Sequence, residues 1–557
     1  MKNKNVMIKE DRISELPELV IENILLRLVS SKDRVRVSVL SKRWCALTAS
    51  FPFFDFNCDE FVKGVYGTIY NHDARYLFYK YVEHSVSRFC CQQNLKNVHT
   101  FKLCSLFKDD VEVGIINKCL ELILEKGLKV LDIDITVYPH LQEYRLPIRP
   151  SSRVSSLTSL TLSQHVLPSS LMVDDANLHS LKVLWLNKVT LDPVVTKNLT
   201  SSCPLLEKLI VEYCYGVKKF SVYGRLQNLK KFRFIDNKFN GVERIDIEAP
   251  YLYECHLSVR PCEGATSVKL GSCKQLRTLY LDGSFFPTSI GFSEFFNNFP
   301  FIENLSLSLH GQCNSLVVSS PSLRKFVLYD ECDLEEIDIN TPNLILFSYA
   351  NECNFRNPCK FKKIDLGELN ARMECHIING VDSLWFKKLR QFLESANRFK
   401  VLKLDNSFLG KISVDFNQLK VTGLLPYELE HVELKLFQEK VLTVLDGILW
   451  CCRPRSLSLT SNFSFMSDKK RSHFLKFISA KLLQQEDKGQ TNIQIEWSFP
   501  SNAETYFSWN SMMPELPDHN KLQTLTFIKE EGPFQEEEKN ETVKGLQMLR
   551  LRICVIL

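Results

Sequence analysis

The 557-residue sequence lacks the features of membrane and exported proteins. No stretch stays apolar for the roughly 18 residues that a membrane-spanning helix requires. The opening residues MKNKNVMIKEDR contain no apolar core of a secretory signal, so we expect no export. We therefore expect the protein to work in the nucleus, the cytoplasm or both.

Motifs of common enzymes and metal sites are also missing. The sequence contains no P-loop, no G-x-S-x-G and no H-E-x-x-H. Its 19 cysteines are scattered, with no C-x-x-C pair and no Cys/His spacing suited to zinc, so we interpret them as reduced thiols. We predict no enzyme activity, no cofactor and no metal site. A nucleophile and a base brought together only in space remain an alternative.

Charge is concentrated at one end of the sequence. The whole chain carries a net charge of +5, whereas residues 1–50 hold ten Lys or Arg and six Asp or Glu, a local +4. The remainder is nearly neutral, which argues against nucleic acid as a partner. The basic N-terminal segment suits an acidic partner.

Residues 12–52 read as two or three short helices. Val20, Ile24 and Leu28 recur at intervals of four, which predicts the apolar face of an amphipathic helix beginning near Pro17. So small a unit buries little surface by itself. We expect its apolar face to pack on the rest of the chain or on a partner.

This segment resembles the F-box of plant F-box/leucine-rich-repeat proteins. The resemblance rests on the pattern formed by Ile13, Leu16, Pro17, Ile24, Leu25, Asp33, Val35, Arg36 and residues 38–44. It implies docking on a Skp-family adaptor and, through that adaptor, on a cullin. The residues that it assigns to the adaptor contact are Leu16, Pro17, Ile24, Leu25, Leu28, Val39, Leu40 and Trp44. The alternative is a solvated group of helices without a partner.

A degenerate repeat fills most of the remaining sequence. Five copies carry Pro five residues before the first apolar residue of a short strand, as in PLLEKLIV at 204–211. Including copies without Pro, these first apolar residues follow one another at 21 to 26 residues, the period of leucine-rich repeats. They are Leu160, Leu184, Leu209, Phe232, Cys255, Leu279, Leu305, Phe326 and Phe347.

The repeat and the F-box resemblance together define the expected fold. Each repeat would supply one strand and a return segment, and stacking would give a parallel sheet with a continuous core behind it. We predict an α/β protein, with a small all-α N-terminal F-box followed by a curved leucine-rich-repeat solenoid whose concave face is a parallel sheet.

The predicted boundaries divide the chain into four parts. They are the F-box at 10–54, a helical linker at 55–94, a degenerate solenoid at 95–465 with a period of about 21–30 residues, and irregular C-terminal repeats or a cap at 466–557 with an acidic loop at 530–541. A helix is predicted within 109–127, ending at Gly127. Segments 425–436 and 444–461 resemble the FBD-type module of such proteins, but no full module is evident after 465.

Strand alternation predicts which side chains face a partner. The residue between the two apolar residues of each strand should point outward on the concave face. Trp, Tyr and Arg at such positions favour an interface, and the predicted substrate-binding row is Trp185, Ile210, Arg233, His256 and Tyr280. Packing of Trp185 and Tyr280 against neighbouring repeats is the alternative.

The last four residues, beginning at Cys554, match a C-a-a-X prenylation motif whose final Leu favours a geranylgeranyl group. Prenylation would bring the protein to a membrane surface, which is the only membrane contact we expect. The alternative is that these apolar residues form one more repeat strand.

The leading hypothesis is a substrate-recognition subunit of an SCF-type ubiquitin ligase, in which the F-box holds the ligase and the repeats hold an unidentified protein substrate. A scaffold that binds the adaptor without driving degradation shares every one of these sequence features. A small-molecule-gated receptor of the same architecture is a further alternative.

Overall fold

The computed structural model comprises two compact units, Met1–Gln275 and Leu276–Leu557, which we describe separately. Between 13 and 461 the described residues are interrupted at 14, 29–30, 50, 67–71, 92–97, 138–143, 145–153, 165–177, 192–202, 223–225, 237–239, 260–265, 284, 286–295, 310–314, 331–333, 335, 352–359, 366–370, 378–379, 397–398, 407–410, 416–418, 420–425 and 437–440. Beyond 461 the structure describes Phe477 and three strands.

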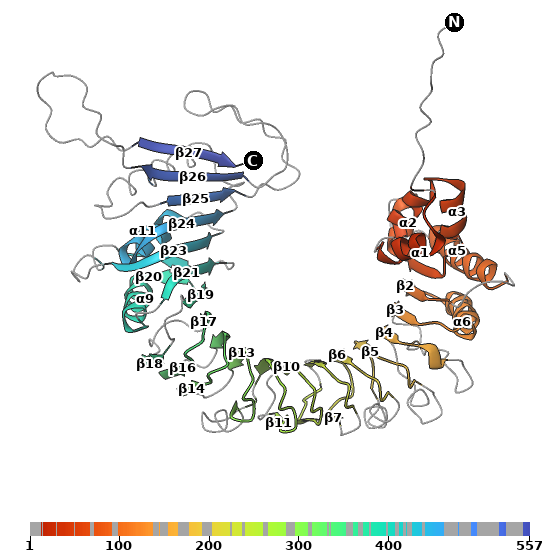
Figure 1. Ribbon diagram of the computed structural model, residues 1–557, viewed down its shortest axis with the longest axis horizontal. Coiled ribbons are helices and arrows are strands. Elements are labelled where there is room, and N and C mark those ends of the chain that lie inside the picture. Colours follow the sequence, from red (N-terminus) through yellow and green to blue (C-terminus); the bar gives the residue numbers. More distant parts are fainter. Residues whose placement is uncertain are drawn as a thin grey trace, which may run out of the picture. The chain divides into compact units, whose positions relative to one another are not determined.

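The N-terminal unit begins with three short helices (Figure 1). They are α1 (Glu18–Arg27), α2 (Ser31–Ser38) and α3 (Lys42–Ala49). Pro17 directly precedes α1, where its missing N–H breaks no helical hydrogen bond. The sequence predicted two or three short helices in this segment, and the structure has three.

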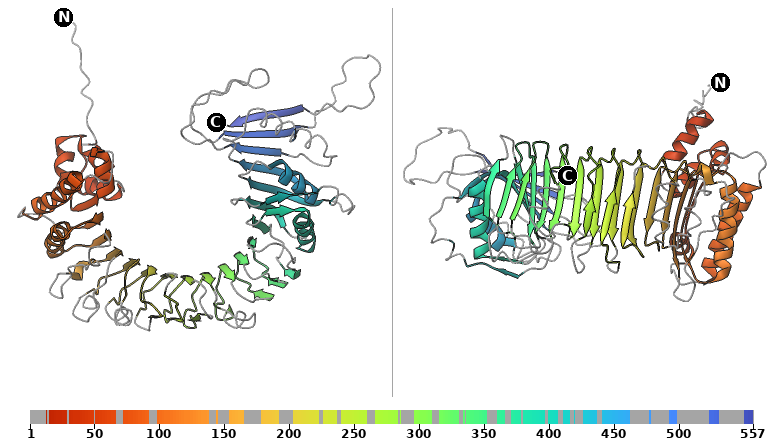
Figure 2. Two further views of the ribbon diagram at one scale, coloured as in Figure 1. Left: turned by 180° about the vertical axis from the view of Figure 1, so that it is seen from behind. Right: turned by 90° about the horizontal axis from the view of Figure 1, so that it is seen from below.

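A parallel sheet follows, which we call the inner sheet of the N-terminal unit. Its strands are β1 (Phe53–Asn57), β2 (Thr100–Phe107), β3 (Val130–Val137), β4 (Ser159–Ser163), β5 (Val183–Asn187), β6 (Lys208–Cys214), β8 (Lys231–Asp236) and β10 (Glu254–Val259). Each strand pairs in parallel with the next in this order. The arrows point the same way in Figure 2. This confirms the predicted parallel solenoid.

The outer side of this sheet changes along the unit. Helices α4 (Cys58–Tyr66), α5 (His72–Cys90) and α6 (Asp110–Glu125) accompany the first strands, and α5 and α6 lie on the outer side of β2 and β3 (Figure 1). Farther along, the outer layer is a small parallel sheet of β7 (Lys219–Val222), β9 (Arg244–Ile247) and β11 (Ser267–Lys269). One turn, η1 (Val154–Ser156), precedes β4.

The C-terminal unit repeats this plan. Its inner strands are β12 (Thr278–Gly283), β13 (Asn304–Leu309), β15 (Lys325–Asp330), β17 (Leu346–Asn351), β19 (Ala371–Ile377), β21 (Phe399–Asn406), β23 (Tyr427–Leu436), β24 (Cys452–Ser461) and β25 (Asn492–Trp497), paired in parallel in that order. Two antiparallel strands, β26 (Gln523–Glu530) and β27 (Arg550–Ile556), follow β25.

The outer layer of the C-terminal unit mixes short strands and helices. It contains β14 (Ser315–Ser319), β16 (Glu336–Asn340) and β18 (Lys360–Asp365) in one sheet, and β20 (Gly380–Asp382) with β22 (Lys411–Ser413) in another. Helices α9 (Ser383–Ala396) and α11 (Val441–Cys451) lie beside β21, β23 and β24 (Figure 1).

The cores form as the repeat predicted. All nine marker residues, from Leu160 to Phe347, are buried. In the N-terminal unit Leu160, Leu184 and Leu209 are aligned on adjacent strands, as are Leu305 and Phe326 in the C-terminal unit. The predicted helix in 109–127 is α6, which Asp109 caps and after which Gly127 adopts a positive φ of 74°.

One part of the predicted linker has a different structure. Residues 55–94 were expected to be helical, but β1 reaches Asn57 and pairs with β2 along its whole length. The alternating burial of Phe53–Asn57 explains the difference, because Phe54 and Phe56 enter the core under the first repeat.

Candidate functional site: the F-box surface and the inner face

The three N-terminal helices enclose a small apolar core. Ile21, Leu25, Trp44 and Phe51 are buried together, and the side chains packed around them are Leu16, Ile24, Leu28, Val37, Leu47 and Phe53. The Trp44 indole donates a hydrogen bond to the backbone oxygen of Ile13 (3.1 Å), which fastens the segment before α1 onto α3. Phe53 belongs to β1, so this core continues into the first strand of the inner sheet.

Two residues assigned to the adaptor contact lie inside this core instead. Leu25 is fully buried and Trp44 is 2% exposed, so neither side chain can contact a partner in this conformation. We correct their role to support of the F-box from within. Leu16, Ile24 and Leu28 are half-buried against the same core, and Pro17 is exposed at the start of α1.

The remaining two predicted residues are openly exposed. Val39 is 81% exposed and Leu40 is 49% exposed, directly after α2. Leu19 and Val20 on α1 are also exposed. The sequence analysis placed Val20 on the apolar face of this helix, but the resemblance assigned neither residue to the adaptor contact. Apolar side chains so exposed on a small helical unit are typical of a surface that binds another protein.

The predicted substrate-binding row is divided between the two units. Trp185, Ile210, Arg233 and His256 align on adjacent strands of the N-terminal unit. Tyr280 belongs to the C-terminal unit, where it is half-buried and aligns with Ser306. Trp185 and Arg233 are exposed, and His256 is half-buried.

Glu212 joins two of these residues, and the sequence analysis missed it. The Trp185 indole donates to Glu212 Oε2 (3.0 Å), and Arg233 Nε lies 2.8 Å from Glu212 Oε1. Both side chains therefore reach toward β6, whose Ile210 is 7% exposed. Ile210 lies in the predicted row between Trp185 and Arg233, but its low exposure leaves little of its side chain for a partner. Glu212 lies two residues after Ile210 on the same strand, so its position on this face was readable from alternation.

Exposed aromatic side chains lie at the end of β6 and directly after it. Tyr213 and Tyr215 are exposed, and Tyr213 has a positive φ of 54° where β6 shifts register against β8. The corresponding residue of the preceding repeat, Lys188, has a φ of 53° and is exposed. Non-glycine residues in this conformation cost about 1 kcal/mol, so the ends of β5 and β6 are held against a local preference.

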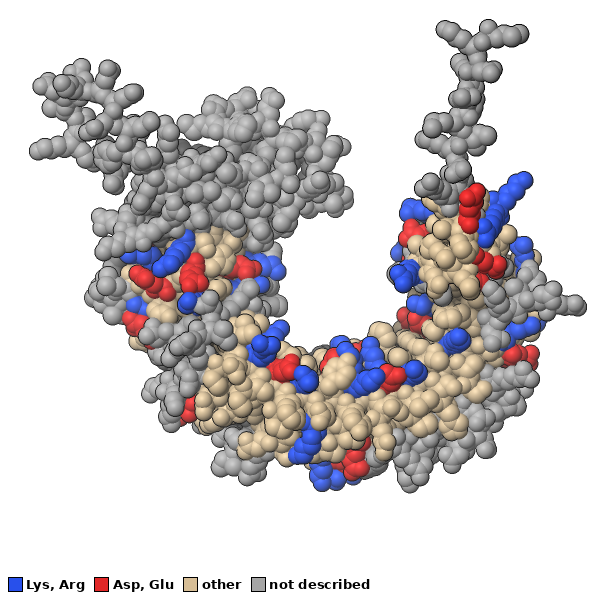
Figure 3. All heavy atoms as spheres, in the orientation of Figure 1, with Lys and Arg blue, Asp and Glu red and all other residues tan. Residues whose placement is uncertain are grey.

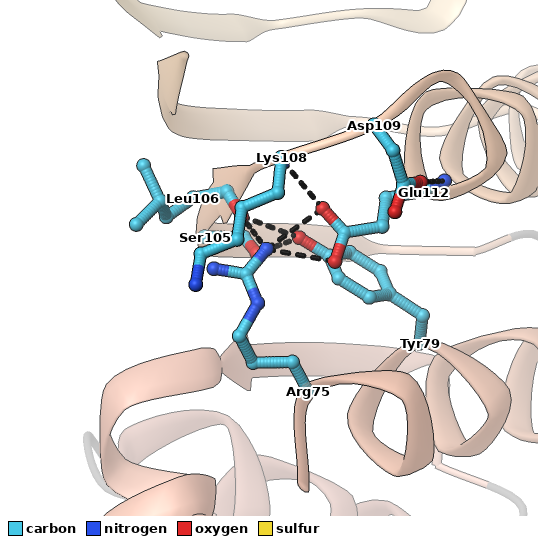
Figure 4. Close-up of polar contacts among 7 residues, drawn as sticks. All are labelled: Arg75, Tyr79, Ser105, Leu106, Lys108, Asp109 and Glu112. Atoms are coloured by element: carbon cyan, nitrogen blue, oxygen red, sulfur yellow. Dashed lines mark hydrogen bonds and ion pairs between the residues drawn. The ribbon is translucent and has the colours of Figure 1, made fainter. Parts of the chain in front are cut away.

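A buried polar network connects α5 to the first repeats (Figure 4). Arg75 Nη2 lies 2.7 Å from both carboxylate oxygens of Glu112 and also donates to the backbone oxygen of Leu106. Glu112 accepts from the backbone N–H of Lys108 (2.6 Å), and Tyr79 donates to the oxygen of Leu106 (3.0 Å). These bonds fix α5, β2 and the start of α6 relative to one another.

Several thiols of the repeats are buried in the core. Burial raises the pKa of the Cys203, Cys214 and Cys452 thiols to about 12, so they stay protonated and weakly nucleophilic at neutral pH. Among the described residues no group of three or more His, Cys, Asp or Glu side chains is placed to hold a metal ion. Nor is any described helix long and apolar enough to cross a membrane.

Comparison with protein families agrees with the two parts of the chain. The F-box domain model matches residues 13–56, and the model "At1g61320/AtMIF1, LRR domain" matches residues 92–319. The chain is an F-box/leucine-rich-repeat protein of the plant type. Proteins of this F-box/leucine-rich-repeat family are typically adaptors rather than enzymes.

Three proteins similar to this chain come from Arabidopsis thaliana. The putative F-box/FBD/LRR-repeat protein At5g44950 is 28% identical over 76% of this chain and 85% of its own length. The putative F-box/FBD/LRR-repeat protein At4g03220 is 28% identical over 44% of this chain and 48% of its own length, and F-box/FBD/LRR-repeat protein At1g13780 is 31% identical over 44% and 53%. The matched region thus spans about half the length of the last two.

Among solved structures, the TLR13–ssRNA13 complex aligns over 69% of this chain and 65% of that chain. The TM-score is 0.28 and the sequence identity is 14%. Because this TM-score is low, the description of the fold rests on the strand order given above.

Proposed function

We propose that this chain is the substrate-recognition subunit of an SCF-type cullin ubiquitin ligase. The exposed apolar residues of the F-box, Val39 and Leu40 above all, carry this proposal. The F-box would dock on a Skp-family adaptor and, through it, on a cullin, while the inner face of the repeats would hold the protein to be ubiquitinated. We propose the nucleus and the cytoplasm as its compartments, which imaging of a fluorescent fusion would test.

The proposed mechanism is proximity. Binding both the ligase and the target would raise the effective concentration of the target's lysines near the ubiquitin-charged enzyme. The apolar core that α1 to α3 share with Phe53 of β1 supports this role, because a receptor of this kind needs a fixed geometry between the F-box and the repeats. The chemistry would occur on another protein.

Co-expression with a Skp-family adaptor tests the proposal. We expect the wild-type chain to purify with the adaptor, and the Val39→Asp/Leu40→Asp variant to lose it, since a charge would replace each exposed apolar contact. Val111→Asp is the matched control, because Val111 is equally exposed but lies on α6, outside the F-box. Well-folded wild-type chain without adaptor would overturn the proposal.

A second measurement separates a degradation receptor from a scaffold. In plant cells, proteins bound by the wild-type chain and not by the Val39→Asp/Leu40→Asp variant would be identified, and their ubiquitination and half-life measured. Shorter half-lives with the wild type support the receptor. Unchanged half-lives with adaptor binding intact would leave the non-proteolytic scaffold.

We propose separately that Cys554 is prenylated. Its backbone lies in β27, aligned with Thr526 of β26, so prenylation would act at the end of a strand. A Cys554→Ser variant that keeps the wild-type membrane fraction in cells would remove this proposal without affecting the ligase role.

A further inference from the structure

The inner face of β5 to β10 differs in charge from that of the first strands. We infer that it binds an acidic protein segment that also carries an apolar residue. This inference rests on the proposed function, in which the segment would belong to the target. We call the surface the basic inner patch and define it by Trp185, Lys208, Lys231 and Arg233 on β5, β6 and β8, together with Lys182 and Lys230 directly before β5 and β8. Charged side chains along the inner rim are visible in Figure 3.

The patch holds an excess of positive charge. Its five cations face three carboxylates, those of Glu207, Glu212 and Glu254. A single carboxylate, Glu207, serves both Lys182 (3.3 Å) and Lys230 (2.9 Å). Within the described part of the chain, no ion pair joins Lys208 to a carboxylate. The patch can therefore accept further negative charge, and the exposed ammonium groups would do so with little reorganisation.

The first strands present the opposite charge. The inner face of β1 to β3 carries Asp55, Asp132 and Asp134 with two lysines, Lys102, which lies 3.7 Å from Asp132, and Lys129 directly before β3. Burial raises the pKa of both Asp132 and Asp134, and neighbouring carboxylates raise that of Asp132 further. An acidic segment would be repelled from β1 to β3 and attracted to β6 and β8. This polarity would fix its direction, with the acidic end away from the F-box.

Trp185 supplies the apolar anchor of the patch. Its ring is 39% exposed, yet its indole N–H is held by Glu212, so the side chain already has one orientation. An anchor fixed before binding loses little conformational entropy when a partner arrives. Aromatic anchors of this kind contribute most to protein interfaces.

Strand spacing sets the length of the recognised segment. Neighbouring strands lie about 4.8 Å apart, so the two steps from β5 to β8 span about 10 Å. An extended chain covers that distance in about three residues. The segment would therefore place carboxylates two to four positions from the apolar residue that contacts Trp185.

Selection from a random peptide display library against the full-length chain tests the inference. Selected peptides would be synthesised with a fluorophore and their affinities measured by anisotropy. We expect peptides in which Asp or Glu lies two to four positions from Leu, Phe or Trp. Replacing their acids by Asn or Gln should weaken binding at least tenfold, and 0.5 M salt should weaken it similarly.

Variants of the chain locate the binding surface. Lys208→Glu should weaken binding at least fivefold and Trp185→Ala at least tenfold. Lys269→Glu makes the same charge change on the exposed outer strand β11 and should leave affinity within twofold. Because Lys208 is exposed, its variant keeps the test valid even if Trp185→Ala perturbs folding.

Three results would contradict the inference that the basic inner patch binds an acidic segment. The inference is overturned if no peptide is selected, if the selected peptides lack acids, or if Lys208→Glu binds them as well as the wild type does. Adaptor co-purification is measured on the same preparations. A chain that binds the adaptor but not acidic peptides would lose this inference and keep the proposed function, whereas peptide binding without adaptor would do the reverse.

Discussion

The start and the middle of the N-terminal unit use the same kind of inner sheet with different outer layers. Behind β2 and β3 lie α5 and α6, joined by the buried Arg75–Glu112 pair. Behind β6 to β10 lie three strands of three or four residues. Directly before β5 and β6, the Lys182–Glu207 pair lies largely in solvent. The comparison teaches that a buried charged pair can fix the relative positions of the elements it joins, whereas an exposed pair contributes little to them.

Breaking the buried pair is expected to have the largest effect. Arg75→Met would leave Glu112 charged and buried without its partner, which costs about 3–5 kcal/mol of folding free energy. Thermal unfolding of the full chain and hydrogen exchange of the β2 and α6 amides would measure it. Arg88→Met, on the exposed side of the same helix, is the control.

The double variant Arg75→Met/Glu112→Leu sharpens the same comparison. Removing both charges should restore most of the lost stability, because a buried pair gains little over apolar packing. The pair would then be responsible for the orientation of α5 rather than for net stability. Equal instability of the single and double variants would contradict this interpretation.

The second-largest effect is expected where helices back the C-terminal unit. A Cβ on Gly447 of α11 would lie 2.2 Å from the Phe386 ring on α9, so Gly447→Ala should cost about 1–3 kcal/mol through overpacking. Gly114 on α6 has nothing within 4 Å of the same position, and Gly114→Ala should stabilise by up to about 1 kcal/mol. Chemical denaturation of both variants checks the opposite signs.

The periodic parts of this structure could be predicted from the sequence, and the outer layer could not. Each inner strand has two apolar residues in alternation at a fixed period, which is enough to place Leu160 to Phe347 in the core. The outer strands β7, β9 and β11 are too short to show a period. Phe386, Leu389 and Leu393 are spaced as in a helix, so α9 could have been predicted from the sequence. It was not predicted, because this segment was assigned to the repeats.

For the candidate sites, the sequence predicted which face of a strand or helix a residue lies on, but not whether its side chain is exposed. Alternation placed Trp185 and Arg233 on the inner face, but whether a neighbour covers Ile210 depends on rotamers that a sequence does not specify. The burial of Leu25 and Trp44 was missed for another reason. A resemblance identifies the positions of an F-box, but it does not separate the residues that form its core from those that are exposed.

A smaller effect is expected from pH at the start of the inner sheet. Burial, together with Lys129, lowers the pKa of His99 below its usual 6.5. As the pH falls, His99 therefore takes up a proton in the unfolded chain at a higher pH than in the folded chain. The contribution of neutral His99 to stability is present above pH 6.5 and lost as the pH falls below it. We expect the melting temperature of the wild type to fall more steeply than that of His99→Gln between pH 7 and 5.5, by a small margin. If the melting temperatures of the two proteins fall in parallel, His99 does not contribute to the pH dependence of stability.

The smallest effect is expected at the exposed rim. The Glu207 side chain is 35% exposed, and hydrogen bonds from Lys230 and Lys182 lower the pKa of its carboxyl group. Because water already solvates all three groups, Glu207→Gln should leave the melting temperature unchanged at low and high salt. The same change removes a negative charge from the basic inner patch and should strengthen binding of acidic peptides about twofold. Loss of stability in this variant would show that rim pairs hold the strand-backed repeats together, and the contrast with Arg75–Glu112 would fail.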